Sequence, residues 1–214
     1  EGTIMPKSIT AVSTIFPIVF LSACSSGDGF QSGPGIDPGF TPEAEIVTLN
    51  PDGSVPDQGF SGIGTNGDIE VFRNETGDRF GFRYQYGRVA NSTRFRGVAG
   101  ILPASDPGAV PTTATATYDA QYDLTYVGND VDRQSGNIAL NADFNAGTVT
   151  GNAGGFAVNG TVTGTDLGGT ASYRGVQADM RGVIGDRRVV GAFAGENANA
   201  LMVGGLIGTP RTTP

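Results

Sequence analysis

Aromatic residues alternate with other residues in the middle of the chain. Four of them occupy every second position: Phe80, Phe82, Tyr84 and Tyr86. Successive side chains of a β-strand point to opposite faces, so this period of two predicts a strand with one aromatic face. A turn-like stretch at 87–91 and a returning strand at 93–101 complete the pattern. We therefore predict a β-hairpin, handle-like region over residues 68–110.

The chain from residue 111 onward is a regular series of short apolar stretches joined by links that contain Gly, Asn or Asp. Strands are predicted at about 113–127, 136–144, 148–152, 155–163, 169–173, 177–184, 189–193 and 200–207. No stretch shows a helical period. Short strands at a spacing of ~8–12 residues are typical of an all-β barrel or sandwich. About eight strands can close a barrel filled by side chains, and closure removes exposed edges. We predict an all-β, eight-stranded antiparallel up-and-down β-barrel over residues 111–209, with a tail at 210–214.

Residues 25–66 are rich in Gly, Pro, Ser and Asp and contain few apolar side chains. Closely spaced turn-forming residues of this kind interrupt strands and are typical of flexible linkers. We therefore interpret residues 24–67 as a lipidated cysteine and a tether. A short strand at 43–50 is the one element that the pattern allows within it.

The beginning of the chain has the layout of a secretory signal peptide. Met5, which we take as the natural start, is followed by Lys7, an apolar run at 15–21 and small residues. The run is too short for a spanning helix, which needs ~20 residues. The sequence Leu-Ser-Ala-Cys at 21–24 resembles the bacterial lipobox, in which the cysteine thiol receives a lipid before cleavage. The resemblance implies removal of residues 1–23 and lipid attachment at Cys24. The alternative is a stray cysteine in an ordinary signal peptide.

The residue after the cysteine bears on the choice of membrane. In Gram-negative lipoproteins an aspartate there favours retention in the inner membrane, and this chain has Ser25. We therefore expect a lipid-anchored protein of the outer membrane, facing the cell surface. The periplasmic face is the other orientation.

The composition argues against several classes of function. The net charge of −8 disfavours nucleic acid, whose phosphates would be repelled. The chain has no histidine and one cysteine, which excludes a Ser–His mechanism, an internal disulfide and a cysteine metal cluster. We expect no enzyme activity, no cofactor and no metal. The stretch 129–136, NDVDRQSG, is faintly similar to a calcium loop but lacks its later acidic ligand, so a hairpin loop is the preferred interpretation.

Arginines are concentrated near the aromatic stripe of this otherwise acidic chain. Arginine and tyrosine often anchor protein interfaces, and arginine binds carboxylates and phosphates well. The hairpin is therefore a candidate ligand or partner face, formed by Arg79, Arg83, Tyr84, Tyr86, Arg94 and Arg96. The alternative, which we favour, is that the aromatics pack on the barrel while the arginines face solvent.

Several motifs in the segment 111–209 follow one another in an order that is typical of a known protein family. They are PTTATATYDAQYDLTYVG, GNIALNADFNAGTVTG, VNGTVTGTDLGGTASYRGVQADMRGVIG and GAFAGENANALMVGGLIGT. This segment resembles the β-barrel domain of transferrin-binding protein B and its small relatives, called transferrin-binding-protein-like solute-binding lipoproteins. The resemblance implies a barrel, a surface location and capture of a ligand. The chain has room for one lobe where large members have two, and it has Ala194 where relatives often carry a polar residue or histidine. No motif allows the family's binding residues to be carried over.

Three functions compete. The leading hypothesis is an outer-membrane lipoprotein that binds a host protein or environmental solute, with iron or haem acquisition suggested by family analogy only. The second is a structural or adhesive cell-envelope protein without a small-molecule ligand. The third, an integral eight-stranded membrane barrel, is disfavoured because the outward faces carry Asn, Thr, Asp and Arg and the chain lacks tryptophan.

Overall fold

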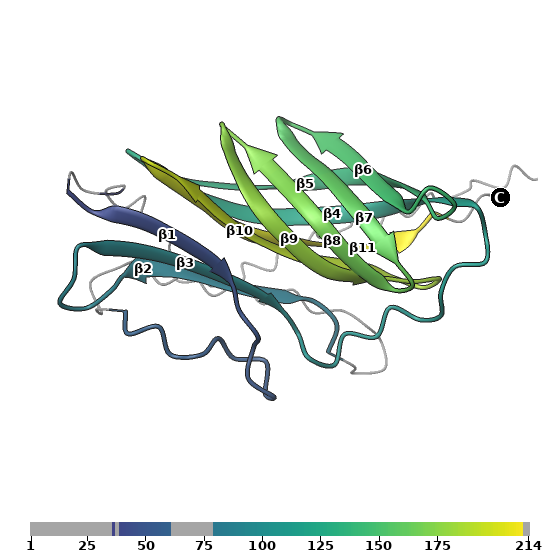
Figure 1. Ribbon diagram of the computed structural model, residues 1–214, viewed down its shortest axis with the longest axis horizontal. Coiled ribbons are helices and arrows are strands. Elements are labelled where there is room, and N and C mark those ends of the chain that lie inside the picture. The colour runs from purple at the N-terminus through teal and green to yellow at the C-terminus, as the bar shows by residue number, and fades with distance from the viewer. Residues whose placement is uncertain (1–35, 37–38, 61–78, 212–214) are drawn as a thin grey trace, which may run out of the picture.

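The protein is an all-β molecule in which a small sheet packs against the outside of a closed barrel (Figure 1). The computed structural model describes residues 36, 39–60 and 79–211. The barrel strands are β4 (Thr115–Val127), β5 (Val131–Asp143), β6 (Thr148–Ala153), β7 (Phe156–Thr163), β8 (Asp166–Tyr173), β9 (Val176–Ile184), β10 (Val189–Asn197) and β11 (Ala200–Pro210). The prediction of an eight-stranded antiparallel barrel is confirmed.

The barrel is a meander that closes where its last strand returns to its first. Each strand from β4 to β11 pairs with the next in the chain, and β11 also pairs with β4. The alternation of side chains along each paired strand places every second residue inside the barrel. The predicted starts of β5 and β8 are too late, because an apolar pattern does not count polar residues. In β5 a polar stretch at 132–135 follows Val131, and β8 begins at Asp166. At the start of β5, for example, Gln134 Nε2 donates to Asp132 at 2.7 Å.

Side chains fill the barrel lumen. Phe156 stacks on Tyr122 with ring centroids 4.6 Å apart, and it contacts Phe193 at 5.2 Å. These rings and the surrounding Val, Leu, Ile, Ala and Met side chains form one buried cluster. An eight-stranded barrel has an interior just wide enough for side chains to fill or for one small ligand, and here side chains occupy it. The described residues therefore leave a ligand the outer surface and the ends of the barrel.

The small sheet consists of β1 (Thr41–Ile46), β3 (Arg94–Ile101) and β2 (Phe82–Arg88), in that order. The predicted hairpin is confirmed in β2 and β3, which pair in antiparallel register. β1 pairs with β3 in parallel. The predicted tether at 24–67 therefore contains a strand that belongs to the folded part, close to the short strand allowed at 43–50. β1 was not predicted as part of the fold because polar residues and turn-forming residues surround it in the sequence. The strand is completed by its pairing with β3.

The outer face of β10 and β11 holds the small sheet. Side chains such as Val190, Ala192, Leu201 and Val203 are buried there against the aromatic face of β2. Two glycines allow the layers to approach closely. A Cβ built on Gly205 would lie 2.3 Å from the Phe82 ring, and one on Gly97 would lie 2.6 Å from Val203 Cγ1. The small sheet and the barrel thus interlock, and glycine is needed at both contacts.

The edge of β1 is protected from further pairing. Its Pro42 has no N–H to offer, and the backbone N–H of Ala44 donates to Glu196 Oε2 on β10 at 2.9 Å. Proline and charged groups at an edge strand discourage edge-to-edge association. This edge is therefore unsuited to adding a strand from a partner.

Candidate functional site

The two tyrosines of the predicted partner face lie between the small sheet and the barrel. Tyr84 and Tyr86 are 0% and 2% exposed. The Tyr86 ring stacks on Phe95 at 6.4 Å between centroids. A partner that meets the arginines of this region would therefore not touch these rings. Their positions agree with the alternative in which the aromatic stripe packs on the barrel.

Tyr84 is the centre of a polar network inside this interface. Its hydroxyl donates to Asp123 Oδ1 at 2.6 Å and lies 3.2 Å from the hydroxyl of Thr125, the one buried polar residue of the described part. The other carboxylate oxygen of Asp123 accepts from Arg133 Nη2 at 3.0 Å. Burial, and then the charge of Asp123, raise the pKa of the Tyr84 hydroxyl well above its usual range. The network fixes the position of β2 on the barrel wall.

We expect Tyr84→Phe to lower the free energy of unfolding at neutral pH by about 1.5–3 kcal/mol, because Asp123 and Thr125 lose a buried partner. The pKa of Tyr84 is raised in the folded state. Its contribution is therefore complete below the unfolded-state pKa of about 10 and is lost as pH rises above that value. Urea unfolding at pH 7 to 11 should show a steeper alkaline decline for the wild type than for the variant. Parallel declines would contradict this role for Tyr84.

The predicted arginines divide into separate groups. Arg94 and Arg96 come together on the side of β3 that faces away from the barrel, where both reach Glu43 Oε2 on β1, at 3.5 and 2.9 Å. Arg79 lies at the other end of the hairpin, where Nη1 donates to the carbonyl of Asp52. Arg83 is partly buried near the start of β2. The carboxylate that joins Arg94 to Arg96 was missed, because β1 was assigned to the linker.

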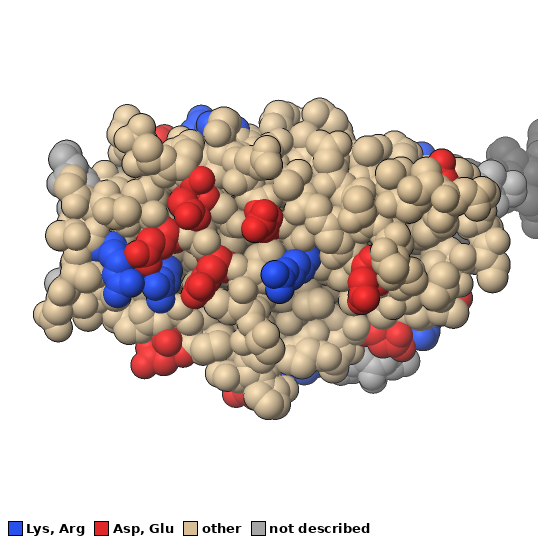
Figure 2. Space-filling view, in the orientation of Figure 1, with Lys and Arg blue, Asp and Glu red and all other residues tan. Residues whose placement is uncertain are grey.

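A cleft of about 780 Å³ opens at the hairpin end of the small sheet. Arg88 Cζ lies 4.8 Å from the centroid of the Phe40 ring, and both residues line the cleft together with Arg94. The Arg94 side chain is 44% exposed. Figure 2 shows that basic and acidic side chains lie beside one another on the face it presents. The cleft thus offers an aromatic ring and arginines in a surface of mixed charge.

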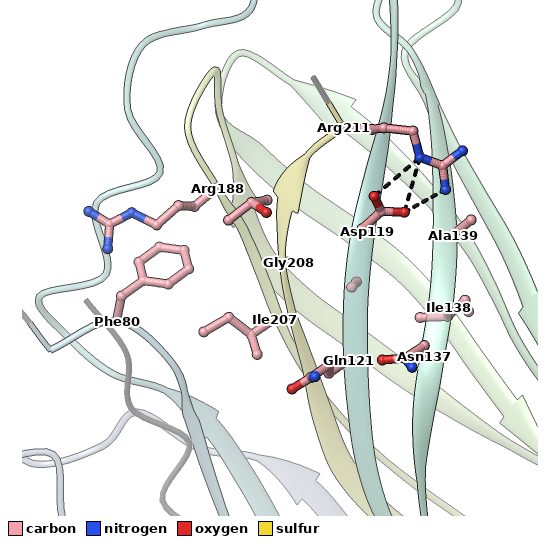
Figure 3. Close-up of a pocket in the computed structure, with 12 residues that line it drawn as sticks. Phe80, Asp119, Gln121, Asn137, Ile138, Ala139, Arg188, Ile207, Gly208 and Arg211 are labelled. Carbon is pink, nitrogen blue, oxygen red and sulfur yellow. Dashed lines mark hydrogen bonds and ion pairs between the residues drawn. The ribbon is translucent and has the colours of Figure 1, made fainter. Parts of the chain in front are cut away.

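A second hollow lies on the barrel wall beside the start of β2. It has a volume of about 510 Å³ and adjoins a smaller one of about 270 Å³ that shares Gln121, Asn137 and Ile207 with it. We call the two together the wall groove. Figure 3 shows its floor on β4, β5 and β11, with Phe80 and Arg188 along one side and the Asp119–Arg211 pair at the other. No pattern along the sequence indicates it, because its residues come from five separate stretches of chain.

Arg188 and Arg211 are held in different ways in the wall groove. Arg188 Cζ lies 4.6 Å from the centroid of the Phe80 ring. Arg211 Nε lies 3.2 Å from both carboxylate oxygens of Asp119, and these hydrogen bonds hold the pKa of Asp119 below its usual value. The carboxylate therefore stays ionised at neutral pH.

The described residues contain no group of three or more His, Cys, Asp or Glu side chains that could hold a metal ion. The calcium-like stretch lies mostly within β5, where Asp132 accepts from the Tyr173 hydroxyl at 3.2 Å and pairs with Arg174 at 3.0 Å. The turn between β4 and β5 is limited to residues 128–130. Nor does this part of the chain hold a helix long and apolar enough to cross a membrane. Cys24 and the lipobox-like sequence before it lie outside the described residues.

Comparisons with known proteins give similarity in structure only. No protein-family model matches the chain, and no curated protein matches it. Among solved structures, transferrin binding protein B from Actinobacillus pleuropneumoniae is 11% identical, covering 67% of this chain and 81% of that chain with a TM-score of 0.47. A protein described as a surface lipoprotein gives the same values.

The haemoglobin receptor HpuA from Kingella denitrificans is 15% identical, with a TM-score of 0.44. The match covers 62% of this chain and 55% of the receptor, so the chain spans about half of that protein's length. At these TM-scores the similarity supports no conclusion about function. The barrel itself is established by the pairing of its strands.

Proposed function

We propose that the chain is the precursor of an outer-membrane lipoprotein that binds a host protein or an environmental solute. The lipobox-like sequence before Cys24 supports the anchor, and the sequence resemblance to transferrin-binding-protein-like lipoproteins supports the binding role. The packed lumen directs binding to the outer surface or the ends of the barrel. The chain has no histidine, and its single cysteine is assigned to lipid attachment, so binding accounts for the available chemistry better than catalysis does.

We assign the partner face from one observation, the arrangement of two arginines on β3. Arg94 and Arg96 project from the side of β3 that faces away from the barrel, and Glu43 orients both guanidinium groups. The Phe40 ring lies in the adjoining cleft. Arginine and aromatic residues, phenylalanine included, are enriched at protein interfaces. A protein with an acidic or mixed-charge surface suits this face.

The test is a pull-down with the mature protein, purified from membranes in detergent, from host fluid or growth medium. Transferrin and human haemoglobin serve as defined probes, because the solved structures include a transferrin binding protein and a receptor in complex with human haemoglobin. We expect R94A/R96A to reduce retention of the captured ligand by about tenfold or more, as the loss of two anchoring residues does at an interface.

Arg187→Ala is the matched control. Arg187 pairs with Asp106 at 2.9 Å, the same distance as the Arg96–Glu43 pair, but it lies in the turn between β9 and β10. Equal losses for the two variants would argue against a specific face. If nothing is captured and the purified protein forms ordered oligomers by light scattering, the structural or adhesive alternative is the better account.

A further inference from the structure

The floor of the wall groove is a regular array of polar side chains. Along β4, Asp119, Gln121 and Asp123 alternate with residues that point into the barrel, so all three face outward. Gln121 lies directly opposite Asn137 on β5, and Asp123 lies opposite Ser135. Gln121, Ser135 and Asn137 are exposed, and among the described residues neither amide has a hydrogen-bond partner. The floor therefore presents unused donors and acceptors on adjacent strands.

The two carboxylates at the ends of this array are each held by an arginine. Arg211 Nε lies 3.2 Å from the oxygens of Asp119, and Arg133 Nη2 lies 3.0 Å from Asp123. The ion pairs orient the carboxylates and balance their charge. A strongly charged ligand is therefore not required, and the chain's overall charge of −8 disfavours a polyanion.

The barrel wall also disfavours an extended peptide. Peptides that bind sheets gain much of their affinity from hydrogen bonds to the backbone of an edge strand. β4 and β11 have a paired strand on both sides, so the middle of the floor offers no edge. β5 pairs with β6 only at Asn141–Asp143, so the open edge of β5 lies at the side of the groove. Recognition by Gln121 and Asn137 therefore uses their side chains.

We infer that the wall groove binds a neutral oligosaccharide chain. Sugar hydroxyls both donate and accept hydrogen bonds. The amides of Gln121 and Asn137 do the same, while the carboxylates accept. Ile207, partly exposed between the amides and Phe80 (Figure 3), offers an apolar surface for the C–H face of a sugar ring. The inference goes beyond the proposed function, because it assigns a second ligand class to a site that contains neither Arg94 nor Arg96.

The experiment is an array of neutral oligosaccharides, probed with the mature protein purified from membranes in detergent and followed by titration of the best binder. We expect Q121A/N137A to raise the Kd of that oligosaccharide about tenfold or more, because each lost hydrogen-bonding group weakens binding several-fold. The matched control is N159A/T170A, an outward-facing amide and hydroxyl directly opposite one another on β7 and β8. It should leave the Kd unchanged.

Three results would overturn the inference: no oligosaccharide is retained, Q121A/N137A binds like the wild type, or a peptide array gives binders that the groove variant loses. Thermal unfolding of both variants checks that the fold is intact. R94A/R96A separates the two sites. If R94A/R96A loses the captured protein but still binds the oligosaccharide, the groove is an independent site. If R94A/R96A loses both ligands, that assignment is contradicted.

Discussion

We expect Cys24→Ala to abolish lipid attachment and to remove the protein from the outer membrane. The proposed anchor is lipid on the Cys24 thiol, and alanine cannot accept it. Membrane affinity from an acyl chain grows by about 0.8 kcal/mol per buried methylene, so loss of the chains removes the whole anchoring energy. Cell fractionation and mass spectrometry of the N-terminal peptide measure the effect. The wild type should be in the outer-membrane fraction with a lipid mass on residue 24, and the variant should lack both.

Ser25→Ala is the control for this experiment, because it changes the neighbouring residue and keeps the thiol. It should remain lipidated and membrane-bound. If Cys24→Ala stays in the outer-membrane fraction, or if the wild type carries no lipid, the sequence 21–24 is not a working lipobox. Residue 24 would then belong to an ordinary signal peptide, which is the alternative stated for it.

Phe82→Ala should be among the most destabilising single changes in the folded part. The Phe82 side chain is 1% exposed and lies over Gly205 on β11, in the contact between the two layers. Truncating a buried phenylalanine costs about 3–5 kcal/mol, because apolar contacts are lost and a cavity remains. Urea unfolding, with tyrosine fluorescence as the probe, measures the free energy. A loss below about 1 kcal/mol would show that the small sheet does not depend on this contact.

Gly205→Val provides an independent check on the same contact. A Cβ at position 205 would lie 2.3 Å from the Phe82 ring and 2.7 Å from the carbonyl oxygen of Gly191. Overpacking of this kind costs about 1–3 kcal/mol. In the double variant F82A/G205V the valine enters space that the ring has left, so the cost should be smaller than the sum of the two single costs. Additive costs would mean that the Gly191 backbone, rather than Phe82, sets the limit at Gly205.

The sequence by itself determined the barrel. Side chains that alternate between a packed lumen and solvent leave a period of two in each strand, and Gly, Asn and Asp mark the turns. This is why the order and approximate positions of all eight strands were predicted. The aromatic period of β2 likewise indicated a strand with one buried face, and Tyr84 and Tyr86 follow that pattern. The lipobox-like sequence at 21–24 is also recognised along a contiguous stretch of chain, and lipid attachment at Cys24 stays a prediction.

Only the tertiary structure decided how distant stretches meet. β1 was hidden in a segment rich in turn residues, because its strand is completed by parallel pairing with β3, about fifty residues later. For the same reason Glu43 was not seen as the partner of Arg94 and Arg96. The wall groove draws on β4, β5 and β11 and on Phe80 and Arg188, and no local pattern joins them. Periodicity reports which face of a strand is buried, whereas strand pairing and layer packing determine which side chains become neighbours.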